Sequence, residues 1–279
     1  MRTTQAQHRS SWGLAALGAF LVSSSSALAA GIGQPVPWQM DRQVAVTENA
    51  RDIHSFEHGM HWLSFGISLF VLGLILYCVF RFSEKANPTP SKTTHNTLIE
   101  VAWTIVPVLI LVAVAIPSFR LLRTQLSDPK ADVLVKVIGH AWYWSYEYPA
   151  VENGGGFTFD ANLDDAKEPK LLGTDNDMVV PVNKIVKIQV TAANVMHSWA
   201  MPSFGFKIDA VPGRLNQFWF KAEREGTYHG QCSELCGARH AYMPITVQVV
   251  SEEAYAKWLA EGKTKFARID DSTKFADAR

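Results

Sequence analysis

The sequence predicts an N-terminal two-helix transmembrane hairpin, followed by an all-β barrel or sandwich domain that ends in a C-terminal helix. Two long stretches without charge, 62–80 and 101–119, indicate the hairpin. Several short runs that alternate apolar and polar residues indicate the β domain. The segment "SEEAYAKWLAEGK" (251–263) is amphipathic and indicates the closing helix.

The N-terminus has the three parts of a secretory signal peptide. Arg2 and Arg9 precede an apolar run at 12–22, and a small-residue A-x-A pattern follows at 27–29. The apolar run is shorter than the roughly 18 residues that a membrane span needs, which argues against a simple anchor. We therefore expect cleavage near Ala30 or the residue before it, and export of the segment that follows.

Each uncharged stretch is long enough to cross roughly 30 Å of hydrocarbon as a helix. Pro107 and Pro117 would break a soluble helix but are tolerated in a membrane helix. The alternative is a buried helical hairpin in a soluble core. The complete absence of charged residues from both stretches disfavours this alternative. The connecting loop carries Arg81, Lys85 and Lys92 against a single glutamate, as expected of a cytoplasmic loop. Everything after the second span then returns to the exported side.

The β domain is predicted from its turn residues as well as from alternation. Gly, Asn, Asp and Pro separate the apolar runs, and this spacing of short strands is typical of a sandwich or barrel. The closing helix has Ser251 as its N-cap and two glutamates in its first turn. The predicted strands are 133–139, 142–148, 157–160, 178–182, 184–190, 217–220 and 245–250, with a further strand around 227–229.

These elements define the expected domains. Lys plus Arg equals Asp plus Glu, at 26 each, so the overall charge says nothing about partners, and there is no Gly-rich phosphate loop. We expect protein and membrane-lipid partners and no nucleic acid. The expected divisions are a signal peptide (1–29), a periplasmic N-terminal segment (30–55), the hairpin (56–125, helices about 56–82 and 98–122), the β domain (126–265) and a tail (266–279).

The stretch "GQCSELCGARHAYMP" (230–244) concentrates potential metal ligands. Cys232, Cys236, His240 and Met243 follow the spacing C-x3-C-x3-H-x2-M, in a predicted loop before the last strand. An exported compartment permits a disulfide, but a disulfide would leave the histidine and the methionine unexplained. Zinc accepts cysteine and histidine, whereas a thioether is a poor zinc ligand. Thiolate, imidazole and thioether together favour copper.

The second cysteine extends this argument to two metal ions. Two thiolates can each bridge two ions, so the donors suit a dinuclear copper centre that needs a second histidine. His197 lies just after the predicted strand 184–190, at a strand-to-loop junction, and is the candidate. A lone histidine there would more often be structural, but the downstream cluster favours a ligand.

Three segments of the chain carry a family resemblance. "VMHSWAMPSFGFKIDAVPGRLNQ", "GQCSELCGARHAYMP" and, behind the two spans, "GHAWYWSYEYP" closely resemble subunit II of haem-copper cytochrome c oxidases. The resemblance is to the bacterial form with a cleaved signal, and it extends from about residue 54 to 263. It implies a cupredoxin-like β domain with the dinuclear copper A (CuA) centre. It also implies a location in the bacterial inner membrane with the copper domain on the periplasmic side.

The resemblance implies roles for individual residues. The copper ligands would be His197, Cys232, Cys236, His240 and Met243, together with the backbone carbonyl of Glu234. The Glu234 carboxylate would bind a magnesium ion shared with subunit I, which holds the haems and reduces oxygen; subunit III would be a further partner. Glu100, at the start of the second span, would admit protons bound for the catalytic subunit, although an interfacial anchor is the alternative from physics alone. Trp142 would receive electrons from cytochrome c, and proton pumping would accompany oxygen reduction.

An acidic run adjoins the aromatic cluster at 142–144. Such a run is usually a solvated face, but an acidic patch also steers a basic partner to the surface. We expect Glu147, Glu152 and Asp175 to dock cytochrome c.

Three other functions remain in view. A related quinol oxidase subunit lacks the copper ligands that are present here, and a nitrous oxide reductase needs a large propeller for which the chain has no room. A periplasmic copper carrier or assembly factor would exchange its copper readily, so metal titration separates it from a buried dinuclear centre.

Overall fold

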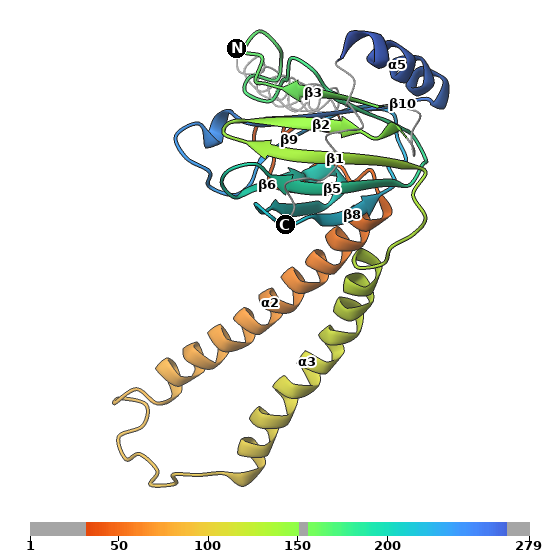
Figure 1. Cartoon of the computed structure of the whole chain (residues 1–279). Helices are drawn as coiled ribbons and strands as arrows, with labels where there is room; N and C mark the ends of the chain where they lie inside the picture. Colours follow the sequence, from red (N-terminus) through yellow and green to blue (C-terminus); the bar gives the residue numbers. More distant parts are fainter. Residues whose placement is uncertain (1–31, 151–155, 267–279) are drawn as a thin grey trace, which may run out of the picture.

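The computed structural model describes residues 32–150 and 156–266. The predicted signal peptide, Glu152 and the tail from 267 lie outside these ranges. Within them, two long helices extend from one side of a β domain, and a shorter helix, α5 (Glu252–Lys265), covers the opposite side (Figure 1).

The two long helices, α2 (Glu48–Arg81) and α3 (Thr97–Gln125), are long and apolar enough to cross a membrane. α2 begins at Glu48, not near 56 as the sequence predicted. The Thr47 side chain accepts a hydrogen bond from the backbone N–H of Ala50, and Glu48 lies in the positive first turn. The first turns of α2 are polar, so they form helix although they lack the run of apolar residues from which the span was predicted. α3 contains both Pro107 and Pro117.

The β domain consists of two five-stranded sheets within the described residues. Alternating burial along β1 and β5 gives each strand one face toward the core, as the sequence predicted. The first sheet has the order β3-β2-β1-β5-β8: β1 (Val133–His140), β2 (Tyr143–Tyr148), β3 (Phe157–Ala161), β5 (Val186–Ala192) and β8 (Asn216–Phe220). The second has the order β4-β10-β9-β6-β7: β4 (Met178–Pro181), β6 (His197–Met201), β7 (Phe206–Ala210), β9 (Gly226–Cys232) and β10 (Pro244–Val250).

The two sheets enclose one core. β1 pairs in parallel with β5, and β4 with β10, while the other pairings are antiparallel. Val137 and Ile188 from the first sheet and Trp199 and Tyr228 from the second are fully buried. The core thus holds the strand ends that carry the predicted ligands in a fixed arrangement.

Direct contacts join the hairpin to the β domain. The Arg51 guanidinium on α2 donates two hydrogen bonds, 2.6 and 2.9 Å long, to the Glu223 carboxylate. Gly205, with φ +76°, lies so close to α2 that an added Cβ would be 2.5 Å from the Ala50 Cα. At the end of α3, the Trp219 indole N–H donates to the Ser127 hydroxyl, 3.2 Å away. These contacts fix the position of the β domain relative to α2 and α3.

Candidate metal centre

The predicted ligands meet at one end of the second sheet. His197 is the first residue of β6, and Cys232 is the last residue of β9, the strand paired with β6. The prediction of His197 at a strand-to-loop junction was wrong in one respect: it begins a strand that the sequence did not indicate. Cys236 and His240 lie in the loop after β9, and Met243 directly precedes β10.

The side-chain donors converge. The two sulfur atoms of Cys232 and Cys236 are 3.8 Å apart, and both thiols are free. Cys232 Sγ lies 3.8 Å from His197 Nδ1, and Cys236 Sγ lies 3.6 Å from His240 Nδ1. A disulfide requires sulfur atoms at about 2.05 Å, so these thiols are placed as ligands rather than as a crosslink.

The other two predicted ligands contact Cys232, Glu234 through its carbonyl and Met243 through its backbone. The Glu234 carbonyl oxygen is 3.4 Å from Cys232 Sγ. Met243 is 1% exposed, and its carbonyl accepts the backbone N–H of Cys232 at 3.0 Å, which joins the two ends of the loop. The loop thus brings soft and borderline donors into a small, mostly buried volume.

Burial favours the uncharged forms of two of these donors, Cys236 and His197. Burial, followed by the neighbouring Cys232 thiol, raises the pKa of the Cys236 thiol to about 12. Burial also lowers the pKa of His197, and the nearby His140 and His240 lower it further. Neutral imidazole binds metal directly, whereas a buried thiolate needs a cation beside it. This donor set fits copper, because thiolate and thioether ligands select it.

Comparisons with known proteins agree with this geometry. The family model described as "Cytochrome C oxidase subunit II, periplasmic domain" matches residues 133–250, and the model of its transmembrane domain matches 35–121. The chain is 44% identical over 246 residues to the probable cytochrome c oxidase subunit 2 of Rickettsia bellii (strain RML369-C), covering 87% of this chain and 91% of the relative. It is 49% identical over 251 residues to the Cereibacter sphaeroides subunit 2, covering 83% of each.

The chain belongs to the cytochrome c oxidase subunit II family. Among solved structures, the periplasmic domain of subunit II of cytochrome oxidase from Bradyrhizobium japonicum is 55% identical. That match covers 50% of this chain and 99% of the solved chain, with a TM-score of 0.48. Membership of this family makes the chain a membrane subunit of an oxidoreductase complex, with a cupredoxin-like β domain.

A subunit II metal centre depends on residues around the ligands, and one of these was missed in the sequence. The Asn194 Oδ1 lies 3.1 Å from His197 Nε2, on the ring side opposite the thiols. Because Nδ1 faces Cys232, the proton on Nε2 donates to Asn194 and fixes the orientation of the ring. Asparagine three residues before a ligand gives no signal by spacing alone. Gly139 also faces this ring, and an added Cβ would lie 2.9 Å from His197 Cδ2.

Trp142 contacts the metal loop directly. Its indole N–H donates to the Cys236 carbonyl at 3.2 Å. Gly237, with φ +117°, lies against the same ring, and an added Cβ would be 3.3 Å from Cζ2. The indole thus packs on the backbone of a ligand cysteine. Trp142 lies in the turn at 141–142 that joins β1 to β2. The rings of His140 and Tyr143, on either side of this turn, stack with their centroids 4.6 Å apart.

The other predicted residues do not join the metal centre. Glu100 lies in the first turn of α3, at the end of the hairpin remote from the β domain. Glu147 on β2 pairs with Lys136 at 3.4 Å. Asp175 is exposed and accepts hydrogen bonds from Asn162.

His229, three residues before Cys232, does not point to the metal centre by its contacts. It is buried, and its Nδ1 lies 3.1 Å from the Leu172 carbonyl, an arrangement that fits a packing role. Burial lowers its pKa, although that hydrogen bond opposes the shift.

Proposed function

We propose that this chain receives electrons from a cytochrome c at a dinuclear copper A centre and delivers them to the haem-copper catalytic subunit, which reduces oxygen and pumps protons. One observation carries the proposal: two free thiols lie 3.8 Å apart, each beside a histidine nitrogen. A mononuclear centre would leave one of these thiols without a function. Two copper ions bound there would supply one-electron redox chemistry.

The chain itself holds the donors in place. Cys232 and Cys236 would hold the two ions through their thiolates, together with the imidazoles of His197 and His240. Met243 and the Glu234 carbonyl would complete the set. Because the strands fix one end of the loop and the Met243 carbonyl fixes the other, the donors would move little when the charge changes. Small rearrangement is what fast electron transfer requires.

Trp142 is the residue at which we propose that electrons enter. Its hydrogen bond to the Cys236 carbonyl gives a short covalent and hydrogen-bonded route from the indole to a ligand sulfur. Glu147, Glu152 and Asp175 would attract the basic cytochrome c, since acidic patches raise the association rate of basic partners.

Two further glutamates would serve the catalytic subunit. Glu234 lies between the two ligand cysteines, so its carboxylate would bind a magnesium ion at the interface with subunit I while its carbonyl faces the copper. Glu100 would collect protons at the cytoplasmic end of α3. Subunit III would complete the complex.

The orientation of the chain follows from charge and processing. A basic loop between the spans favours the cytoplasmic side, and a cleaved signal favours export of the N-terminus. The copper domain would then face the periplasm of a bacterium, with the spans in its inner membrane.

The copper content and spectra of the purified protein test the proposal. We expect two copper ions per chain that share one unpaired electron when oxidised, observed by metal analysis and by EPR. One copper per chain with a blue-copper spectrum would refute the dinuclear centre. Rapid loss of copper to a chelator would instead favour a copper carrier.

A further inference from the structure

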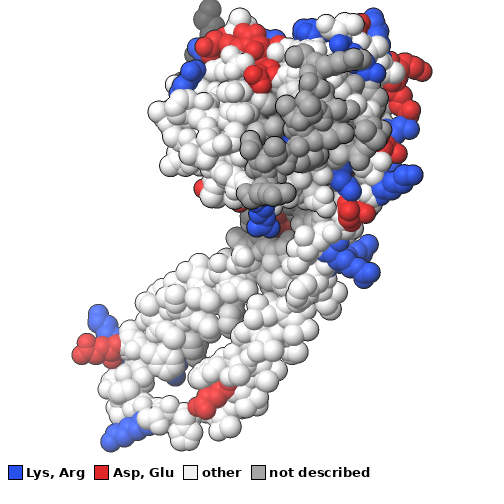
Figure 2. Space-filling view, in the orientation of Figure 1, with Lys and Arg blue, Asp and Glu red and all other residues white. Residues whose placement is uncertain are grey.

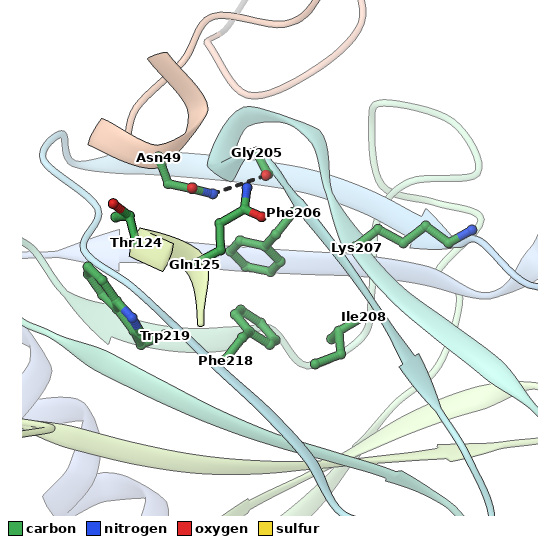
Figure 3. A pocket seen from close by; sticks show the side chains of 9 residues that line it. All are labelled: Asn49, Thr124, Gln125, Gly205, Phe206, Lys207, Ile208, Phe218 and Trp219. Atoms are coloured by element: carbon green, nitrogen blue, oxygen red, sulfur yellow. Dashed lines mark hydrogen bonds between the residues drawn. The ribbon is translucent and has the colours of Figure 1, made fainter. Parts of the chain in front are cut away.

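Two hollows adjoin the first turns of α2, and they differ in the chemistry of their linings. One, of about 240 Å³, lies between α2, the end of α3 and the strands β7 and β8 (Figure 3). Its lining of amide, hydroxyl, aliphatic and aromatic side chains and one lysine includes no thiol, imidazole or carboxylate. The other, of about 250 Å³, lies between α2 and the segment that precedes it. Its lining includes three imidazoles, two carboxylates and a guanidinium: His54, His58, His61, Asp41, Glu57 and Arg42.

The three histidines lie on α2 outside its uncharged run. That run begins at Trp62, after all three of them. Figure 2 shows that charged side chains gather where the hairpin meets the β domain, while most of the hairpin surface below is uncharged. Ala50 packs against Gly205 of the β domain, and His54 follows Ala50 by one turn on the same side of the helix. The groove between α2 and α3 is lined by other residues of α2 and by none of the histidines, so the histidines do not face α3.

Spacing and charge single out two of the three histidines. His54 and His58 are four residues apart, the spacing at which two histidines on one helix face can bind the same metal ion. Asp41 lies within electrostatic range of both. His61 is seven residues from His54, ~10.5 Å along the axis at ~1.5 Å per residue, and interacts with Glu57.

Asp41 supplies a third donor at a suitable distance. Its Oδ2 atom lies 3.9 Å from His58 Nε2. Zinc binds imidazole nitrogen and carboxylate oxygen at about 2.0–2.2 Å, so two donors on one ion lie no more than about 4.4 Å apart. Glu57 is engaged elsewhere, because its carboxylate accepts hydrogen bonds from Nε and Nη2 of Arg42.

We propose that His54, His58 and Asp41 bind one zinc ion, with water as the fourth ligand. Imidazole and carboxylate suit Zn²⁺, whereas Ca²⁺ and Mg²⁺ prefer oxygen donors alone. Among the described residues, only the thiol centre already has three donors within 4.8 Å of one another, so side chains of this site turn when the ion binds. The side chains of His58 and Asp41 are 59% and 74% exposed, which leaves them free to change rotamer.

The ion ties the segment before α2 to the helix. Without it, the Arg42–Glu57 pair is the ion pair that joins this segment to α2, and exposed pairs of this kind contribute little free energy. Bound zinc should therefore slow backbone hydrogen exchange in residues 39–42. This consequence distinguishes the proposed site from chelation by the two helix histidines alone.

Zinc binding to the purified oxidase, with its copper bound, tests the site. Equilibrium dialysis against buffered free zinc, followed by metal analysis, gives the affinity and the number of ions per chain. We expect His58→Gln and Asp41→Asn each to weaken binding of one zinc per chain at least tenfold, because even an outer-shell partner of a metal ligand contributes roughly 10–100-fold. Asp52→Asn is the matched control for Asp41→Asn, because it removes a carboxylate from α2 that lines the groove toward α3.

Two further measurements fix the ligand set. His61→Gln should retain the zinc that His58→Gln loses, with copper spectra unchanged in every variant. Zinc should slow hydrogen exchange of residues 39–42 in the unaltered protein and not in Asp41→Asn. Equal zinc affinity in Asp41→Asn and Asp52→Asn overturns the proposal, and so does a loss from His61→Gln as large as that from His58→Gln. Unchanged zinc content in His58→Gln would leave that histidine only as the ion-pair partner of Asp41.

Discussion

The ligand side chains differ in how strongly each would hold copper. The two thiols are buried and close together, whereas Met243 contributes a thioether, the weakest donor of the set. Loss of a cysteine removes a bridge, but loss of the thioether removes only a weak bond. Substitution of a cysteine should therefore disrupt the copper centre itself, whereas substitution of Met243 should only change its properties.

Met243→Leu should keep both copper ions and raise the reduction potential. Leucine preserves the buried volume, and removal of a weak donor disfavours the oxidised form. The expected shift is on the order of 59 mV if the thioether favours that form tenfold. Potentiometric titration of the copper absorption measures it. Cys232→Ser is the contrasting variant, and it should abolish the dinuclear EPR signal. An unchanged potential in Met243→Leu would exclude the thioether as a ligand.

Asn194→Leu should weaken copper binding without removing any ligand. The side chain holds His197 through Nε2, and loss of such a partner typically costs roughly 10–100-fold in metal affinity. Asn194→Asp retains an acceptor oxygen and should rescue most of the affinity. Competition with a copper chelator gives both values. Equal affinity in the leucine variant and the unaltered protein would show that Asn194 does not orient the ring.

At the scale of elements, the sequence predicted most of the framework. The alternating strands and the closing helix lie within a few residues of their predicted ranges, because their periodicity is local. β6 and β7 were missed because Pro202 and Gly205 between them indicated a loop, and β6 is buried along most of its length rather than alternating. Cys232 through Met243 were found because the loop gathers them in sequence. Asn194 contacts His197 through a local hydrogen bond that its three-residue spacing does not reveal, and Gly139 reaches the same ring through a tertiary contact.

The turn between β1 and β2 provides a test at the element scale, because Trp142 packs on the metal loop at Gly237. Gly237→Ala should displace the indole and slow electron transfer from cytochrome c while copper content is kept. Gly213→Ala is the matched control: Gly213 has φ +75°, but an added Cβ there meets nothing within 4 Å. Both variants should lose about 1–3 kcal/mol of free energy of unfolding through backbone strain. Stopped-flow rates should separate them, and equal rates would argue against the role of this contact.

At the scale of the whole molecule, the proposed proton and electron functions lie at opposite ends. Glu100 begins α3 at the end of the hairpin away from the metal centre (Figure 1). Glu100→Ala should lower steady-state oxygen consumption by about tenfold, since proton delivery by a positioned acid contributes at least such factors. Copper spectra and cytochrome c binding should not change. Glu84→Ala, in the connecting loop, is the control. Full turnover at all pH values would leave Glu100 as an interfacial anchor.

The proposed docking surface for cytochrome c includes Glu147 on β2 and Asp175, which lies outside the strands, and the two differ in their distance from Trp142. Ala161 on β3 pairs with Trp144 near the start of β2, and Trp142 directly precedes β2. Asn162 follows Ala161 and is hydrogen-bonded to Asp175, so Asp175 also lies near the start of β2. Glu147 lies five residues from Trp142 along the strand, about 17 Å away. It is also paired with Lys136, which offsets its charge.

Asp175→Asn should therefore slow association with cytochrome c more than Glu147→Gln, by roughly twofold to tenfold at low salt. The difference in association rate should vanish at high salt, where screening removes the attraction of exposed charges.

Trp142→Phe should leave association with cytochrome c nearly unchanged and slow electron transfer, because phenylalanine cannot donate to the Cys236 carbonyl. Stopped-flow kinetics across a salt series would resolve the two steps. Normal electron transfer in Trp142→Phe would mean that electrons enter elsewhere, and a steeper effect at Glu147 would move the docking surface along β2.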